Sequence, residues 1–548
     1  MNIKTEPKEI WSEYEKLQKY LANNNIYEIV KNNENFYIGK QWEGMKALDM
    51  PKPVINILQR GGKYMIATIS SNDISVSITP FSKSSDDIDK MKPIANEVEK
   101  VIELGKFKED SKMAIRNAFV DGACYAMQSF DPDYETGQPL KGRIVNNLVD
   151  ITNMYMGNPY SNDIQSQPFI IVSMRQHVEQ VREEARIQGL NEDEVEMINA
   201  DNDSNQSNDD SDNLCTVLLK FYKKRIVENE EEITIENEDG SIDIIRNERK
   251  SVFFTKTTKD VTIIKETNLG YSRYPIACFG WDPIKNSCLY TSPMTSIIPN
   301  QIFINKCFGI AQAYGLQNAF PKVVIDRNKA NLNDITKNPN STISVSGLDM
   351  MGKLLDFIKA PDFSNQIIHL IDTTISQTKE CMGVNDAALG NVKPDNTSAI
   401  IALQEATNLP LELQRQSFYG FWEDIVRNIV DIMANDYGLR KVRFDNNGVA
   451  DIASVDFSLL KEMNYEINVD IGNGAQYSEI AQMQTLDKIY GAQMIDEITY
   501  MESIPSKYVP NKGKIMQYLK QKKEQPVMQQ QIDPNAQNIN LTGGQFNG

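Results

Sequence analysis

The sequence predicts an α+β fold spread over several units, and three observations lead to that prediction. The chain has 548 residues, 41% hydrophobic and 24% charged, a globular composition that suffices for roughly three or four domains of about 150 residues. Apolar residues recur with the helical period near the start of the chain and over much of its second half. Between these parts, short alternating runs and turn residues predict strands.

The first segments are predicted to be mainly helical. Residues 7–31 carry apolar side chains at helical spacing, and residues 54–65 repeat the pattern after two prolines. The alternating run at 74–78 predicts a strand with serines on one face. A pair of helices is expected next, at 86–105 and 108–129.

The part of the chain from about 141 to 285 changes to β-type patterning. Strands are predicted at 143–149, 169–174, 216–222, 232–235, 242–245, 251–255, 261–264 and 275–279. One charged helix is expected at 177–188, and Glu238-Asp239-Gly240 forms the clearest hairpin turn. Residues 190–248 hold 18 acidic and 5 basic residues, a balance of −13 that supplies most of the net charge of −18. A solvated outer face is the expected reason for this excess.

The helix predicted at 295–317 differs from the others because it is apolar on nearly every side. Its only charged residue is Lys306. Such a helix must be buried on most of its faces, either within an ordinary core or between neighbouring subunits.

A small β-rich insert and a second helix follow. Residues 320–365 are nearly neutral, with 6 basic and 5 acidic residues, and strands are expected at 320–326 and 342–345. A helix with isoleucines on one face is expected from about 365 to 382, ending at Gly383. Gly, Pro and Asn then predict a loop over 384–396.

The remaining chain alternates between helices and strands. Helices are predicted at 397–406 and 410–437, strands at 441–444 and 465–471, and helices again at 477–490, 495–501 and 511–523. The residues after 524 are polar and rich in Gln and Asn, a composition that is prone to disorder unless a partner holds it.

Composition argues against most catalytic and metal-binding classes. The chain has two histidines, His177 and His369, and six cysteines with no CxxC spacing, so a hydrolase triad or a zinc site is not expected. No Walker, HExxH or GxSxG motif occurs, and Asp201-Asn202-Asp203 opens a calcium-like loop that lacks the required Gly and Glu. No signal peptide or membrane span is predicted. We expect no cofactor, no metal and no catalytic residue.

The succession of elements resembles the portal proteins of tailed double-stranded DNA bacteriophages or prophages. Local matches are the FYIGKQW segment at 36–42, Tyr274-Pro275-Ile276 leading into Ile298-Pro299-Asn300-Gln301-Ile302, and the helix opening at Asp395-Asn396-Thr397-Ser398. The resemblance spans about residues 30–520. No single motif is diagnostic, so the order of elements carries the comparison.

The resemblance implies an assignment of segments to the parts of a portal subunit. The mixed wing would comprise residues 1–290 and 397–473, the latter with a tunnel helix at its start. The stem helices would be 291–319 and 365–383, the clip 320–364, the tunnel loop 384–396, the crown 474–523 and a polar tail 524–548.

The resemblance also implies partners and a place of work. Such proteins form homo-oligomeric rings, usually of twelve subunits, at one vertex of the virion capsid, after assembly in the host bacterial cytoplasm. Double-stranded DNA passes through the bore during packaging by a separate terminase and during ejection. Further implied partners are the major capsid protein and, at the clip, a head–tail adaptor, with no membrane involved.

Two sets of candidate residues follow from this assignment. The DNA-facing candidates in the tunnel loop are Asn385, Asn391, Lys393, Asp395 and Asn396. Stem packing is expected to involve Ile297, Ile302, Ile304, Phe308, Ile367, Ile371 and Ile375. Lys393 is the only cation in the loop that could meet a phosphate, although a solvent-facing lysine without a role is an equal alternative.

Two other functions remain open at the level of sequence. The 75 carboxylates could include a magnesium-dependent nucleic-acid-processing site, although no compact Asp/Glu cluster with a lysine occurs in one β-rich unit. Another virion structural protein could share the acidic balance and the polar tail. The order of helix, β insert, helix, loop and helix in 290–408 favours the portal over both.

Overall fold

The computed structural model describes most of the chain. It covers residues 3–44, 50–70, 74–81, 85–138, 140–201, 213–236, 242–318, 322–326, 342–345, 355–358, 364–383, 409–446, 449–461, 465–471 and 476–504, with single positions between 509 and 519. The chain divides into two compact units, one formed by Met1–Arg443 with Ile452–Gly474 and the other by Phe444–Asp451 with Ala475–Gly548.

A three-stranded antiparallel sheet lies at the centre of the first unit. Its order is β3-β2-β9, with β3 at Arg143–Asp150, β2 at Ala123–Asp131 and β9 at Ile276–Gly280. The first six residues of β2 are buried without alternation, so both faces of this strand are covered. Helices α5 (Phe107–Asp121) and α11 (Glu412–Ile432) supply the covering contacts.

The sequence pattern over 108–129 was expected to be one helix, and this prediction is wrong for its last part. Helix α5 ends at Asp121 because Gly122 adopts φ +99°, a conformation that favours glycine. A side chain at Gly122 would also lie 2.6 Å from the carbonyl oxygen of Tyr290. The apolar run after Gly122 is the buried strand β2, and apolar periodicity cannot distinguish such a strand from a buried helix.

The N-terminal helical pattern, which has a break before Ile26, forms two helices. Helix α1 covers Pro7–Asn23 and α2 covers Ile26–Ile38. They are separated at Asn25, which has φ +56°, a left-handed conformation that Asn tolerates better than most residues. Helix α3 (Ile57–Ile69), strand β1 (Ile74–Pro80) and helix α4 (Ser85–Leu104) follow close to their predicted positions.

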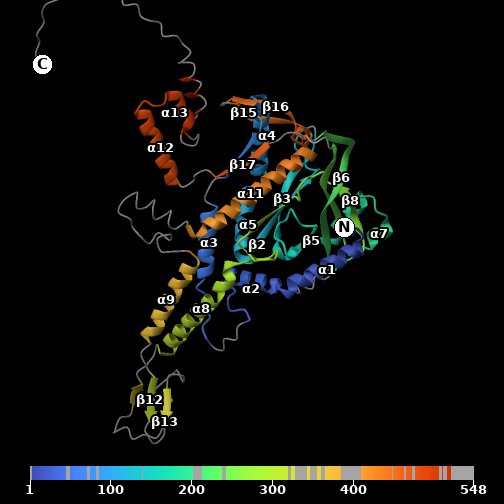
Figure 1. The fold of residues 1–548 in the computed structure, drawn as a ribbon. Coiled ribbons are helices and arrows are strands. Elements are labelled where there is room, and N and C mark those ends of the chain that lie inside the picture. Colours follow the sequence, from blue (N-terminus) through green and yellow to red (C-terminus); the bar gives the residue numbers. More distant parts are fainter. Residues whose placement is uncertain are drawn as a thin grey trace, which may run out of the picture. The chain divides into compact units, whose positions relative to one another are not determined.

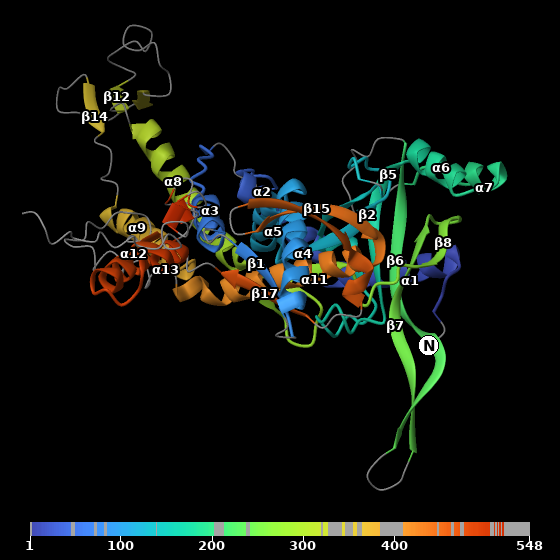
Figure 2. The same cartoon turned by 90° about the horizontal axis from the view of Figure 1, so that it is seen from above.

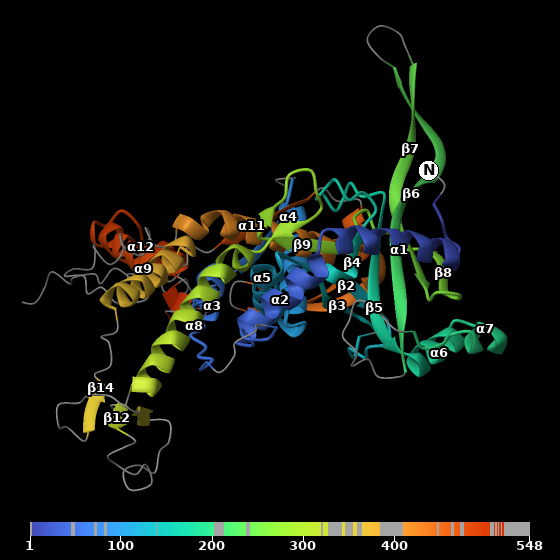
Figure 3. The same cartoon turned by 90° about the horizontal axis from the view of Figure 1, so that it is seen from below.

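A five-stranded antiparallel sheet forms the other large β element, in the order β4-β5-β6-β7-β8. Its strands are β4 Met154–Met156, β5 Phe169–His177, β6 Leu214–Glu236, β7 Ile242–Thr257 and β8 Thr262–Asn268. Helices α6 (Val178–Ile187) and α7 (Glu192–Glu196) follow β5. Strands β6 and β7 each join two predicted strands and extend as a two-stranded ribbon beyond their neighbours (Figures 2 and 3).

Distant parts of the chain meet in the first unit through β1 and β17. Strand β17 (Tyr465–Ile471) pairs antiparallel with β1, so that Ile78 stands opposite Ile467. Strand β15 (Leu439–Asn446) pairs with β16 (Val449–Asp456), a strand that the sequence did not predict. Two short strands, β10 (Asp282–Pro283) and β11 (Tyr290–Thr291), form a small pair.

The apolar segment predicted at 295–317 is helix α8 (Pro293–Asn318), and the segment at 365–382 is α9 (Asn365–Cys381). The insert between them contains β12 (Lys322–Asp326), β13 (Thr342–Val345) and β14 (Leu355–Ile358). Strand β12 is central, parallel to β13 and antiparallel to β14. The β-rich prediction for this insert is therefore confirmed, with one strand more than expected.

The second unit contains helices α12 (Gln476–Gly491) and α13 (Glu497–Ser503), close to their predicted bounds.

In the first unit, helix α11 continues through a π-helical turn at Met433–Tyr437. Among the helices that the structure describes, none is long and apolar enough to cross a membrane.

Candidate functional site

Helices α8 and α9 lie side by side in the first unit (Figure 1). The Asn300 amide donates a hydrogen bond to the Thr378 hydroxyl across this contact, with an N–O distance of 3.3 Å. Of the predicted packing residues, Ile297, Ile304 and Ile371 are buried, and Ile302, Phe308, Ile367 and Ile375 are partly buried. The predicted packing set therefore lies on the two helices, partly covered within a single subunit.

One face of α8 is fixed to the body of the subunit by buried amide side chains. Gln301 accepts a hydrogen bond from the backbone N–H of Ile57 at 3.1 Å and donates to the carbonyl of Ile55 at 2.6 Å. Asn305 donates to the side-chain oxygen of Gln41 at 2.6 Å, and its own oxygen accepts from Gln301 at 3.0 Å. All three amides are at most 2% exposed, so each hydrogen bond is made away from water.

The first turn of α8 is fixed in the same way. Asn33 on α2 donates to the carbonyl of Val120 at 2.8 Å and to the Thr295 hydroxyl at 3.0 Å. Ser292 donates to the carbonyl of Phe119 at 2.7 Å. These hydrogen bonds connect α2 and α5 to the start of α8 and fix its position.

Helix α8 passes close to the backbone at Pro51, and this contact requires a glycine at position 309. A side chain there would lie 2.9 Å from the carbonyl oxygen of Pro51. The segment after the FYIGKQW match therefore crosses directly over the helix, and Gly309 permits that crossing.

The face of α8 opposite Gln301 and Asn305 leaves large apolar side chains in water, since Phe303 is 38% exposed and Ile310 47%. Leu316, near the C-terminal end of the helix, is 72% exposed. On α9, Ile368 and Leu370 are each about half exposed. Singly exposed apolar residues are ordinary, but two adjacent helices that both carry them form a surface that gains free energy when it is covered.

The tunnel-loop candidates are not among the residues that the structure describes. Asn385, Asn391, Lys393, Asp395 and Asn396 all fall in 384–408, together with the helix predicted at 397–406. Their role therefore stays a prediction.

Three partly buried carboxylates join α11 and the turn after it to the connection before β9. Asp431 accepts hydrogen bonds from the backbone N–H groups of Ser272 and Arg273 at 2.8 and 3.1 Å, and Asp424 accepts from the Arg273 guanidinium at 2.5 Å. The Tyr271 hydroxyl donates to Asp436 at 2.5 Å. Burial raises the pKa of all three carboxyl groups, and the hydrogen bonds oppose that rise.

Asp121 lies at the end of α5 and has the most perturbed carboxyl group of those described. Its pKa is raised to about 7, mainly by burial and also by the negative charges of Asp150 and Glu34, while Arg116 opposes the rise. One of its oxygens has no hydrogen-bond partner among the residues described. A buried carboxyl group of this kind destabilises the fold when it is charged.

The described residues offer little for catalysis. They include no group of three or more His, Cys, Asp or Glu side chains that could hold a metal ion. Both histidines are exposed. Burial raises the pKa of Cys124, Cys278 and Cys307, which keeps these thiols protonated and unreactive.

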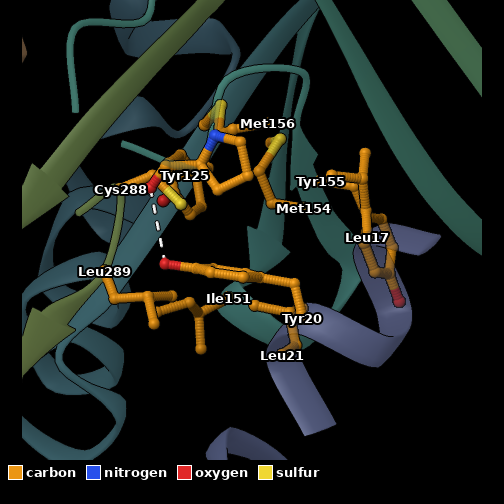
Figure 4. Close-up of a pocket in the computed structure, with 11 residues that line it drawn as sticks. Leu17, Tyr20, Leu21, Tyr125, Ile151, Met154, Tyr155, Met156, Cys288 and Leu289 are labelled. Atoms are coloured by element: carbon orange, nitrogen blue, oxygen red, sulfur yellow. Dashed lines mark hydrogen bonds between the residues drawn. The ribbon is translucent and has the colours of Figure 1, made fainter. Parts of the chain in front are cut away.

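One cavity in the first unit is small and lined mainly by apolar side chains. It measures about 10 Å³ and lies where α1 packs near β4 (Figure 4). Tyr20 spans it and donates to the carbonyl of Pro159 at 3.4 Å. A space of this size is at the lower limit for one water molecule, so it reflects imperfect packing of α1 and offers no room for a substrate.

The sequence did not predict the buried amides that position α8. Gln301 and Asn305 are four residues apart in an otherwise apolar helix, and this spacing on a predicted buried face was the available signal. Asn33 and Gln41 gave no such signal because the partners that link them to α5 and α8 are more than 80 residues away.

Comparison with known proteins gives one family. A family model described as "Phage P22-like portal protein" matches residues 17–542. No curated protein matches the chain.

Proposed function

The chain belongs to the P22-like family of phage portal proteins, and from this premise we propose that twelve copies close into a ring around a DNA-conducting bore. The function of a portal protein is structural: it provides the passage for the genome at one vertex of the capsid. The match to the family model over nearly the whole chain is the observation that carries this conclusion. It covers every segment to which a portal role is assigned, except the first 16 residues of the wing and the end of the polar tail.

The exposed apolar side chains of α8 and α9 support assembly into a ring. In a closed ring, each pair of helices meets a neighbouring pair on both flanks. Phe303, Ile310 and Leu316 would then leave water, at roughly 25 cal/mol per Å² of apolar surface removed from it. The buried amides Gln301 and Asn305 would hold α8 at a fixed angle, so that identical contacts repeat from copy to copy.

The charge of the chain suits a passage through which DNA must slide. Its net charge is −18, and a strongly basic bore would bind phosphates through the release of counterions. An acidic subunit lets DNA move with few strong contacts. Within this scheme Lys393 in the tunnel loop is a candidate for a single phosphate contact.

We assign the segments to portal parts as the sequence led us to expect. Helices α8 and α9 are the stem, the β12–β14 insert is the clip, and 384–396 is the tunnel loop. The wing comprises residues 1–290 and 397–473, and the crown comprises 474–523. The polar tail, 524–548, follows the crown.

The proposed partners follow from these parts. The clip would bind a head–tail adaptor, the wing would contact the major capsid protein, and a separate terminase would drive DNA through the ring. The protein would assemble in the host bacterial cytoplasm and remain in the virion. No observation favours the magnesium-dependent enzyme, and the family match favours the portal over another virion protein.

A packaging experiment tests the function directly. Capsids are produced in infected cells with and without this chain, and nuclease-resistant DNA per particle is measured. Particles that lack the chain are expected to remain empty, whereas particles that contain it are filled. Equal filling of both kinds of particle would overturn the proposal.

A further inference from the structure

A cleft of about 520 Å³ lies beside the C-terminal end of α4. It is lined by Glu97, Lys100, Val101, Leu104, Gly105, Lys106, Tyr134, Glu135, Thr136, Gln138, Gly142, Arg143, Ile144, Val145, Tyr437 and Arg440. We call it the basic cleft, because four of these residues are cations and two are carboxylates.

The wall of the basic cleft contains a buried guanidinium group. Arg440 is 3% exposed, lies 3.8 Å above the ring of Tyr437, and donates hydrogen bonds to the backbone carbonyls of Tyr437, Lys141 and Gly142. No carboxylate of the described residues forms an ion pair with it. A buried charge without a counter-charge costs free energy, so an anion in the cleft would be stabilised by this group.

The other cations of the cleft are arranged around its rim. Arg143 stacks on Tyr134 at 4.0 Å, and Lys106 is exposed at the start of α5. The two carboxylates of the lining are already paired, Glu97 with Lys100 at 3.1 Å and Glu135 with Lys141 at 2.8 Å. Arg143 approaches Asp131 at 3.7 Å, a long contact, so positive charge remains in excess.

This excess is unusual in a chain with a net charge of −18. A recess lined by arginine and stacked tyrosine suits carboxylates, which accept two parallel hydrogen bonds from one guanidinium. Duplex DNA instead needs several cations spread along its backbone. The cleft therefore favours an acidic polypeptide segment.

Two segments of the chain are strongly acidic and contain no lysine or arginine, residues 192–212 and residues 228–243. Only the second includes described strand residues that pair with nothing but each other. Residues 228–243 include eight acidic residues and no lysine or arginine. Of these residues, 228–236 lie in the outer part of β6 and 242–243 in β7. We call residues 226–236 of β6 and 242–249 of β7 the acidic ribbon. There β6 and β7 pair only with each other among the described strands, and the ribbon extends away from the sheet (Figures 2 and 3).

A two-stranded ribbon of this kind is only marginally stable in water without further packing. None of the described residues of the ribbon lines the basic cleft of the same subunit. An occupant supplied by this chain would therefore come from a second copy.

We propose that the acidic ribbon of one subunit binds in the basic cleft of another subunit and links neighbouring copies. This inference rests on the proposed ring, because the ring brings many copies together at fixed spacing. The ribbon gains a partner for its strands and its carboxylates, and Arg440 gains a counter-charge. The link is electrostatic, so it weakens as salt concentration rises.

Cross-linking within the assembled full-length protein tests the link. Subunits labelled with ¹⁵N and unlabelled subunits are mixed before assembly and treated with a carbodiimide, which joins a carboxylate directly to a lysine amine. Mass spectrometry is expected to find Lys100 or Lys106 joined to residues 228–243 in peptides that combine both isotopes. Cross-links confined to one isotope, or none at these lysines, would overturn the proposal.

Charge reversal provides the matched comparison. Lys106→Glu is expected to raise the subunit concentration at half-dissociation of the assembly about tenfold, whereas Lys112→Glu, at an exposed position of α5, changes it less than about twofold. Adding Glu230→Lys and Glu231→Lys to Lys106→Glu is expected to restore assembly. Failure of this restoration, or protection of Lys106 by DNA instead of by the ribbon, would contradict the inference.

The two proposals fail in distinguishable ways. If the unmodified protein forms no ring, the proposed function fails. If rings form but no cross-link joins ribbon and cleft of different copies, only the ribbon–cleft link fails.

Discussion

Asp121 illustrates how a single residue makes the stability of the subunit depend on pH. Its pKa is raised to about 7 in the fold, mainly by burial, against about 3.9 in an unfolded chain. The folded state therefore binds a proton that the unfolded state has lost between about pH 4 and 7. Because the folded state binds more protons, stability falls as pH rises through this interval.

We predict that Asp121→Asn stabilises the subunit at pH 8 by about 2 kcal/mol, since it removes the buried charge. The gain is expected to shrink toward zero at pH 4, where the carboxyl group is protonated in the fold. Urea unfolding followed by circular dichroism at both pH values measures the difference. Asp260→Asn, at an exposed position, serves as control, and an equal gain at pH 8 and pH 4 would contradict the assignment.

Gln301 carries a second prediction at the scale of a residue. Gln301→Ala removes a side chain that is bonded to Ile55, Ile57 and Asn305, and leaves their buried polar groups without partners. We expect a loss of about 2–4 kcal/mol in the free energy of unfolding.

Gln312 provides the matched control on the same helix because it is exposed. Gln312→Ala is expected to change stability by less than about 0.5 kcal/mol. Equal effects of the two variants in thermal or urea unfolding would show that the buried amides do not hold α8.

At this scale the sequence predicted the apolar packing residues but missed the polar ones. Periodicity located Ile297, Ile304 and Ile371, which are buried, because apolar spacing reports directly on a helix face. It did not locate the amide partners or the buried acids, because these depend on contacts between segments far apart in the chain. The contact between Asp431 and Ser272, for example, spans 159 residues.

At the scale of an element, the two faces of helix α8 have different surroundings. One face is bonded to α2, α3 and α5 of the same subunit, and the other presents Phe303 and Ile310 to water. We predict that Ile310→Asp leaves the subunit folded but prevents ring assembly, because a charge replaces an apolar contact between copies. Size-exclusion chromatography with light scattering measures the assembled fraction.

The control for this variant is Ile187→Asp at the end of α6, where the isoleucine is 77% exposed. It introduces the same charge outside α8 and α9 and is expected to leave assembly unchanged. Normal rings from Ile310→Asp would remove α8 from the interface.

The elements that the sequence predicted best are those with long and regular patterns. Helices α8, α9 and α11 and strand β17 lie within a few residues of their expected bounds. The sequence missed β2 because it is buried on both faces and lacks alternation, and it missed β4, β14 and β16 because each is short or polar. Such strands form because they pair with strands from elsewhere in the chain, and the local sequence pattern alone does not predict them.

At the scale of the whole molecule, the order of elements carried more information than any single motif. A largely apolar helix, a β insert and a second helix appear in the structure in the order that the sequence predicted. The family match over residues 17–542 agrees with the resemblance that this order suggested. The expected three or four domains correspond to two compact units, because most of the described elements of the first unit share one core.

Ring formation is the property on which the assignments of stem, tunnel loop and clip all depend. Mass photometry of the purified full-length protein, combined with negative-stain electron microscopy, measures it most directly. We predict particles of about twelve times 62.2 kDa with cyclic symmetry and a central bore, as closed homo-oligomers require. A monomer or dimer at every concentration tested, also in the presence of the capsid proteins, would contradict the account.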